Sequence, residues 1–118
     1  MKYALLINHG DAPTPRDPEA WGRLSEEEQQ QVYADWQAIN ETDGVTPGSY
    51  LAAPESATTV RVEDGRTLTT DGPFTTVKEA LGGFLTIEAD DLDAAIELAS
   101  RIPAARLGGS VEVRPVIE

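Results

Sequence analysis

Cysteine is absent from this 118-residue chain, and histidine occurs once, as His9. Without cysteine the protein has no disulfide, no thiolate nucleophile, no iron–sulfur cluster and no cysteine-ligated zinc. His9 and the nearby Asp11 are too few ligands for a metal ion, which needs several converging donors. We therefore predict no metal site. The absence of cysteine also fits a cytoplasmic protein, which is the location that we expect.

Basic residues are scarce. The chain has 9 Lys and Arg against 21 Asp and Glu, which gives a formal charge of −12. Nucleic-acid binding depends on Lys and Arg that displace counterions from phosphates, and anionic membranes attract basic segments. We therefore expect neither a nucleic-acid nor a membrane partner. Solubility is the simplest role for the acidity.

Long hydrophobic runs and phosphate-binding loops are also missing. The apolar run at residues 3–7 is too short for the core of a signal peptide or for a membrane span. Gly82-Gly83 does not precede a helix, and the Lys-Ser/Thr of a phosphate loop does not follow it. No nucleophile elbow, zinc-protease motif or calcium loop occurs either. The sequence therefore predicts no cofactor.

What is present is a pattern typical of a single small domain over residues 1–118. Residues 2–9 alternate as a strand, which places Tyr3 and Leu5 on one face and Ala4 and Leu6 on the other. Both faces are apolar, so both sides of the resulting sheet should be covered.

Two amphipathic helices follow from the spacing of apolar residues. The first is expected over residues 25–41, because Ser25 and Glu28 form a capping-box pattern and Val32, Trp36 and Ile39 recur at helical spacing. Asp90 is expected to cap the second. Its predicted buried stripe consists of Leu92, Ala95, Ile96, Ala99 and Ile102.

Further strands are predicted at residues 49–53, 81–88 and 110–117, with a hairpin whose turn is Asp64-Gly65 and whose strands are residues 58–63 and 66–70. The adjacent glycines Gly82 and Gly83 indicate a bulge or a close approach by another group. This order predicts an α+β, ferredoxin-like antiparallel sheet with two helices on one face. Since no helix remains for the other face, we expect a homodimer that packs sheet against sheet.

A series of motifs begins at Asp71-Gly72-Pro73-Phe74 and continues in order along the rest of the chain. Its later members are Val77-Lys78-Glu79, Leu81-Gly82-Gly83-Phe84, Ile87-Glu88, Asp91-Leu92-Asp93-Ala94-Ala95 and Glu112-Val113-Arg114-Pro115. Each motif alone is weak, but together they resemble the DGPF group of the YCII-related family. The resemblance implies that the ferredoxin-like fold forms a dimeric α+β barrel.

The resemblance also implies two kinds of function. Members of the wider family have been proposed as small-molecule enzymes that use a histidine–aspartate pair, and a dehydrochlorinase of aromatic degradation is similar. DGPF-type proteins are often encoded beside extracytoplasmic-function sigma factors, which implies a non-catalytic accessory role instead. The histidine proposed for the wider family lies on the first helix, where this chain has Gln29, Gln30, Gln31 and Val32.

His9 and Asp71 are the candidate catalytic residues. His9 follows the first strand, where polar groups on a rigid sheet face a cleft, and imidazole transfers protons near neutral pH. Asp71 precedes a turn that Pro73 stiffens, so its carboxylate could orient the imidazole and raise its pKa. The alternatives are a solvated loop histidine and an aspartate that caps its own turn.

The candidate ligand-binding residues are Gly72, Pro73, Phe74 and Phe84. The two phenylalanines would form apolar walls, with core packing as the alternative for each. Trp21, in the proline-rich loop, could close over the cleft. The sequence thus favours a homodimer that binds an unidentified small molecule and, if it is an enzyme, performs cofactor-free proton transfer or elimination. The alternatives are the sigma-factor accessory protein and a ligand sensor without chemistry.

Overall fold

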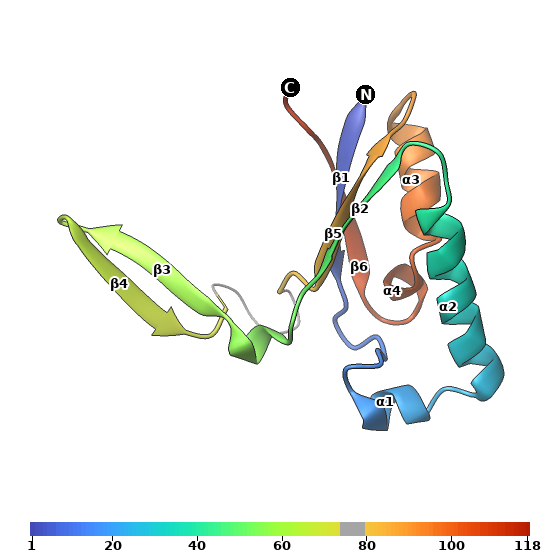
Figure 1. Cartoon of the computed structure of the whole chain (residues 1–118), viewed down its shortest axis with the longest axis horizontal. Helices are drawn as coiled ribbons and strands as arrows, with labels where there is room; N and C mark the ends of the chain where they lie inside the picture. Colours follow the sequence, from blue (N-terminus) through green and yellow to red (C-terminus); the bar gives the residue numbers. More distant parts are fainter. Residues whose placement is uncertain (74–79) are drawn as a thin grey trace.

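The computed structural model describes residues 1–73 and 80–118, which form one sheet layer, one helix layer and a projecting hairpin (Figure 1). The four-stranded sheet has the order β2-β5-β1-β6, and every neighbouring pair is antiparallel. Its strands are β1 (Lys2–Asn8), β2 (Val45–Tyr50), β5 (Gly83–Glu88) and β6 (Ser110–Pro115). This order is consistent with the predicted ferredoxin-like α+β fold. Closure into a dimeric barrel requires a second copy and stays a prediction.

The two longest helices lie on one side of the sheet, and the short 3-10 helix lies by the base of the projecting hairpin (Figure 1). The helices are α1 (Pro18–Gly22), α2 (Glu26–Asn40), the short 3-10 helix η1 (Pro54–Ser56), α3 (Leu92–Ser100) and α4 (Pro103–Arg106). None of the helices in residues 1–73 and 80–118 combines the length and apolarity that a bilayer crossing requires.

The core lies between the sheet and the helices and follows the predicted alternation of β1. Tyr3, Leu5 and Ile7 are almost fully buried, whereas the residues between them face the opposite side of the sheet. The rest of this core comes from β5 and from the helices, namely Leu85, Ile87, Ile39, Ala95, Leu98, Ala99, Ile102 and Ala104. The side of the sheet opposite the helices, which we call the open face, is not covered by any helix or strand within residues 1–73 and 80–118.

The first long helix, α2, confirms the predicted capping box. The Glu28 backbone N–H donates to Ser25 Oγ (3.1 Å), and the Ser25 backbone N–H donates to Glu28 Oε1 (2.9 Å). These bonds also hold the pKa of Glu28 below its usual range. Helix α1 was not predicted. It starts at Pro18, whose missing N–H costs nothing at a first helical position, behind the cap Asp17.

Helix α3 corrects two details of the sequence prediction. Its cap is Asp91, whose side chain accepts from the Ala94 N–H (2.9 Å), and not Asp90. Its inward face is built on Ala95, Leu98 and Ala99, while Leu92 and Ile96 are each 48% exposed. These three residues therefore face the sheet, and Leu92 and Ile96 are turned outward.

Strand β2 begins at Val45, earlier than the predicted residue 49, and so includes a proline. Pro47 lies inside it, and a proline is tolerated there because an edge strand has one unpaired side. The pairing with β5 shifts by one residue between Pro47 and Tyr50. This bulge places Tyr50 opposite Gly83, on the same face as Pro47 opposite Leu85.

The predicted hairpin is confirmed. It consists of β3 (Thr58–Glu63) and β4 (Arg66–Asp71), and it pairs as a two-stranded sheet of its own. Asp64 and Gly65 have φ angles of 52° and 76°, as a two-residue turn with both central residues at positive φ requires. The hairpin projects from the main sheet on the side away from the helices (Figure 1).

Candidate functional site

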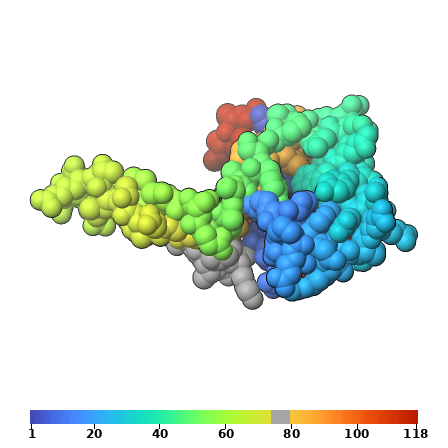
Figure 2. Space-filling view, turned by 60° about the horizontal axis from the view of Figure 1, so that its bottom comes forward, coloured from blue at the N-terminus to red at the C-terminus, as the bar shows by residue number. Residues whose placement is uncertain are grey.

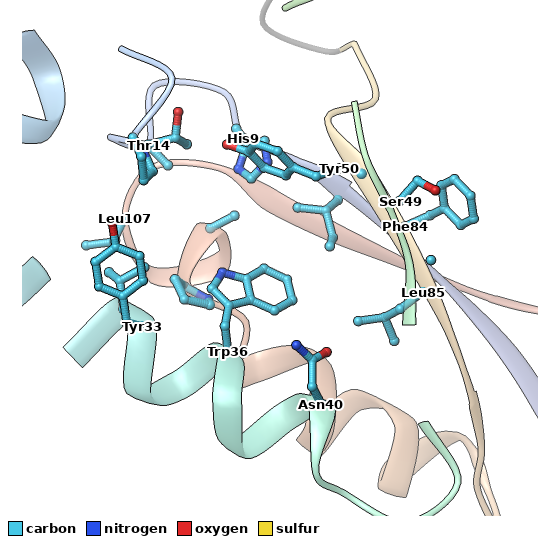
Figure 3. Close-up of a pocket in the computed structure, with 18 of the residues that line it drawn as sticks. His9, Thr14, Tyr33, Trp36, Asn40, Ser49, Tyr50, Phe84, Leu85 and Leu107 are labelled. Atoms are coloured by element: carbon cyan, nitrogen blue, oxygen red, sulfur yellow. The ribbon is translucent and has the colours of Figure 1, made fainter. Parts of the chain in front are cut away.

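A cavity of about 390 Å³ lies on the helix side of the sheet, between α2, the ends of β1 and β2, and the loop that follows β1 (Figure 3). Most of its wall is aromatic or apolar, and the polar side chains are few. The principal apolar residues are Val32, Tyr33, Trp36, Pro47, Tyr50, Leu85 and Leu107, and the polar ones are His9, Thr14, Asn40 and Ser49.

His9 stands at the upper end of this cavity, directly after β1 (Figure 3). Its ring meets the Tyr50 ring edge to face, with centroids 5.5 Å apart and planes at 71°. Its Nε2 atom is shielded from solvent and has no hydrogen-bond partner among the described residues. Burial lowers the pKa of His9 below its usual value, and the nearby Arg16 lowers it further. His9 is therefore neutral at pH 7 and can accept a proton.

Gly82 makes room for the imidazole. A Cβ atom at this position would lie 2.2 Å from His9 Cδ2 and 3.0 Å from Nε2. The Gly82 N–H donates to the Ile7 carbonyl (2.7 Å), which fixes the backbone beside the ring. A Cβ at Gly83 would meet the Ser49 carbonyl at 3.1 Å. The close approach that the two glycines indicated is thus an imidazole at one and a neighbouring strand at the other.

Replacing Gly82 by alanine should displace the imidazole. Overpacking of this kind typically lowers the free energy of unfolding by about 1–3 kcal/mol, and the pKa of His9 should rise as the ring moves toward solvent. Thermal unfolding and an NMR titration of the imidazole would measure the two effects. Gly22→Ala is the matched control, because nothing lies within 4 Å of the added methyl group. If Gly82→Ala and Gly22→Ala had the same unfolding temperature and the same imidazole titration, His9 would not lie against Gly82.

Arg16 is a site residue that the sequence analysis missed. Its guanidinium carbon lies 4.4 Å from the centre of the Tyr50 ring, and Nη1 donates to the Leu51 carbonyl. Arg16 therefore holds Tyr50 from one side while His9 contacts it from another. Nothing in the local sequence marks this arginine, because the contact depends on how the proline-rich loop folds back over β2.

Helix α2 supplies the opposite wall through Val32, Tyr33, Trp36 and Asn40, which share one face of the helix. Figure 3 shows Trp36 and Asn40 directed toward the cavity. Trp36 belongs to the apolar stripe that the helical spacing predicted. Trp21 stacks edge to face on Tyr33 with centroids 5.5 Å apart, so it supports this wall from α1.

The predicted aspartate turn lies at the base of the hairpin. Asp71 is exposed at the end of β4, and no hydrogen bond or ion pair within the described residues joins it to His9. The Gly72 N–H donates to the Ala57 carbonyl (2.7 Å), and its carbonyl accepts from Thr59 Oγ1 (2.8 Å). Pro73 borders a separate shallow hollow. A His9–Asp71 pair stays a prediction, and Phe74 lies outside the described residues.

Phe84 is among the residues that border the cavity, but its ring is on the open face. The pairing of Leu85 with Leu5 turns Leu85 toward the helices, and alternation turns Phe84 the other way. Gly48 accommodates this ring, because a Cβ there would lie 2.6 Å from Phe84 Cδ2. Figure 3 shows the phenyl group beyond the strand, away from Trp36.

Within residues 1–73 and 80–118, no group of three or more His, Cys, Asp or Glu side chains is arranged to hold a metal ion. The polar groups that face the cavity are instead an imidazole, an amide and hydroxyls. This set is suited to hydrogen bonding and proton transfer.

Comparison with known proteins shows the family. The YCII-related domain matches residues 1–118. An uncharacterised protein of Rhizobium meliloti (strain 1021) is 35% identical over 121 residues, which cover 98% of this chain and 92% of the relative. Neither match separates the DGPF group from the rest of the family, so that finer assignment stays a prediction. The chain belongs to the YCII-related domain family.

Proposed function

We propose that this protein binds a small, largely apolar molecule in the aromatic cavity and that His9 accepts a proton from it. One observation carries the proposal: His9 lines a cavity of ligand size, and its buried Nε2 has no partner among the described residues. Leaving a buried polar atom unpaired costs free energy, and a bound molecule that supplies a donor would recover it.

The shape and chemistry of the wall define the class of ligand. Tyr33, Trp36 and Tyr50 offer flat aromatic surfaces, which favour a planar or aromatic ligand. His9 and Asn40 lie at different ends of the cavity (Figure 3). A ligand with an apolar body and a hydrogen-bonding group at each end satisfies both.

The chemistry that fits is proton abstraction without a cofactor. A neutral imidazole in an apolar setting can take a proton from carbon or oxygen, and the electron pair left behind forms a double bond as a leaving group departs, or stays as an anion. The Arg16 guanidinium, which lies over the Tyr50 ring, would stabilise developing negative charge. The contribution of Asp71 stays a prediction that Asp71→Asn would test.

We also propose that two copies pack through their open faces. Ala4, Leu6 and Phe84 form the apolar centre of this face; Leu6 pairs with Phe84, and Ala4 lies on the same face of β1 opposite Thr86. An exposed apolar area on a sheet is commonly an interface between subunits.

An NMR ligand screen that uses the His9 imidazole as the reporter tests the cavity. The chain has one histidine, so each state gives one clean set of signals. A panel of neutral, phenolic and anionic aromatic compounds should include members that shift the imidazole and quench tryptophan fluorescence. Binding that leaves the His9 signals unchanged would contradict the proposed role of His9. If no compound binds and a protein co-purifies stoichiometrically, the accessory-protein alternative would stand instead.

A further inference from the structure

Among the described residues, the β3–β4 hairpin is an arm that pairs with no other strand. The strands pair with each other and not with the main sheet, and Figure 2 shows them standing out from the body as a narrow projection. The arm contributes to a radius of gyration of 16.0 Å, whereas a compact chain of this length would have about 13–14 Å. An isolated two-stranded ribbon is marginally stable in water, so this arm needs a covering surface.

One face of the arm suits burial. We call it the valine face, and it consists of Thr58, Val60, Val62, Thr67, Thr69 and, at its base, Asp71. Val60 and Val62 are 58% and 68% exposed, which is unusual for β-branched apolar side chains in neighbouring positions. Apart from Asp71, its residues are β-branched and uncharged, and such residues form good sheet surfaces.

The distribution of charge identifies the partner. The chain carries a net charge of −12, so two copies repel each other unless the surfaces that meet have little net charge. The valine face carries one charge, that of Asp71 at its base, and the open face carries Lys2 and Arg114 against Glu88 and Glu112, which balance. An acidic partner can approach a surface of low net charge without strong repulsion. A second copy of this chain is such a partner, and it offers the same two surfaces.

The geometry brings these surfaces to one side. In Figure 1 the arm leaves the base of the sheet on the side of the open face, away from α2 and α3. A second copy seated on the open face therefore lies alongside the arm. We propose that the β3–β4 hairpin is a dimerisation arm that packs its valine face against a second copy of this chain. This inference rests on the open-face homodimer proposed above.

The test is the dimer dissociation constant, measured by sedimentation for the wild type and two matched double variants. Val60→Glu with Val62→Glu places two carboxylates on the valine face, and the constant should rise by about 100-fold because buried unpaired charge is costly. Leu68→Glu with Thr70→Glu places the same charge on the other face of the arm, and a change below about threefold is expected there.

A second measurement covers the case in which the glutamates unfold the arm. Because the chain has no cysteine, single Val62→Cys and Leu68→Cys variants each give one reactive thiol. At concentrations that favour the dimer, the cysteine at position 62 should react with a maleimide at least tenfold more slowly than the one at position 68.

The outcomes separate the two proposals. A wild type that stays monomeric at high concentration would overturn both the open-face dimer and the arm. A dimer that tolerates the valine-face glutamates, or in which both cysteines react equally, would overturn the arm alone. Neither result bears on ligand binding in the cavity, which the imidazole reports separately.

Discussion

Replacing His9 by phenylalanine should lower the rate of proton transfer on a cavity ligand by about 10²–10⁴-fold, the usual contribution of a positioned base. The variant should nevertheless fold at least as well as the wild type. Phenylalanine fills the niche beside Gly82 and removes a buried nitrogen that has no partner among the described residues. Relief of such an unpaired group is worth at most about 1–3 kcal/mol. Turnover and thermal unfolding of the same samples would measure the two effects.

The same variant should change how stability depends on pH. Burial holds the pKa of folded His9 below the value near 6.5 that it has when unfolded. Between these two values the unfolded chain binds more protons, so the wild type loses stability as the pH falls from about 6.5 through the lower, folded pKa. His9→Phe should lack this loss.

His9→Gln is the control that separates titration from packing. Glutamine does not titrate, so the pH-dependent loss should vanish with it as well, but its polar amide should not bring the stabilisation expected of phenylalanine. A wild type whose stability does not change between pH 7 and pH 5 relative to both variants would contradict the buried, neutral imidazole. Unchanged turnover in both variants would remove His9 from the mechanism.

Replacing Leu98 by alanine should lower the free energy of unfolding by about 2–5 kcal/mol, the range for a large-to-small change in a core. Leu98 is 1% exposed and packs in the cluster that joins α3 to β1 and β5. A domain of this size should lose on the order of 10 °C in Tm. Denaturant unfolding monitored by circular dichroism would measure the change.

Leu92→Ala makes the same chemical change on the same helix. Leu92 is 48% exposed, so it should cost less than about 1 kcal/mol. The pair also decides between two orientations of α3, because the sequence pattern placed Leu92 in the buried stripe and left Leu98 out of it. A larger loss of unfolding free energy from Leu92→Ala than from Leu98→Ala would show that α3 turns Leu92, and not Leu98, toward the core.

The features that the sequence predicted correctly are local ones. Asp64-Gly65 specifies its turn through backbone conformation alone, and the Ser25–Glu28 capping box is complete within four residues. The alternation of β1 needs only the rule that neighbouring side chains point to opposite faces. The position of His9 beside a cleft was also foreseeable, since His9 follows directly on that strand.

The missed features depend on contacts between distant segments. The face of α3 that turns inward depends on which of its residues pack into the core with β1 and β5. The cavity needs α2, the loop after β1 and a bulged edge strand together, and the ring of Phe84 is turned from it by pairing with β1. Arg16 reaches Tyr50 and Leu51 across 34 and 35 positions of sequence, and no local pattern encodes that contact.

Because β2 has a bulge, the chain could lose one residue at this point and still place the same aromatic ring in the cavity. In a regular strand every second residue faces the same side, so Val45 and Pro47 share a face and Tyr50 would lie on the other one. The extra residue of the bulge brings Tyr50 onto the face of Val45 and Pro47, opposite Gly83. Deleting Ser49 would straighten the strand and still leave the tyrosine opposite that glycine. Relatives one residue shorter at this point are therefore compatible with the same cavity, whereas a two-residue difference would reverse the parity and turn the aromatic ring away from His9.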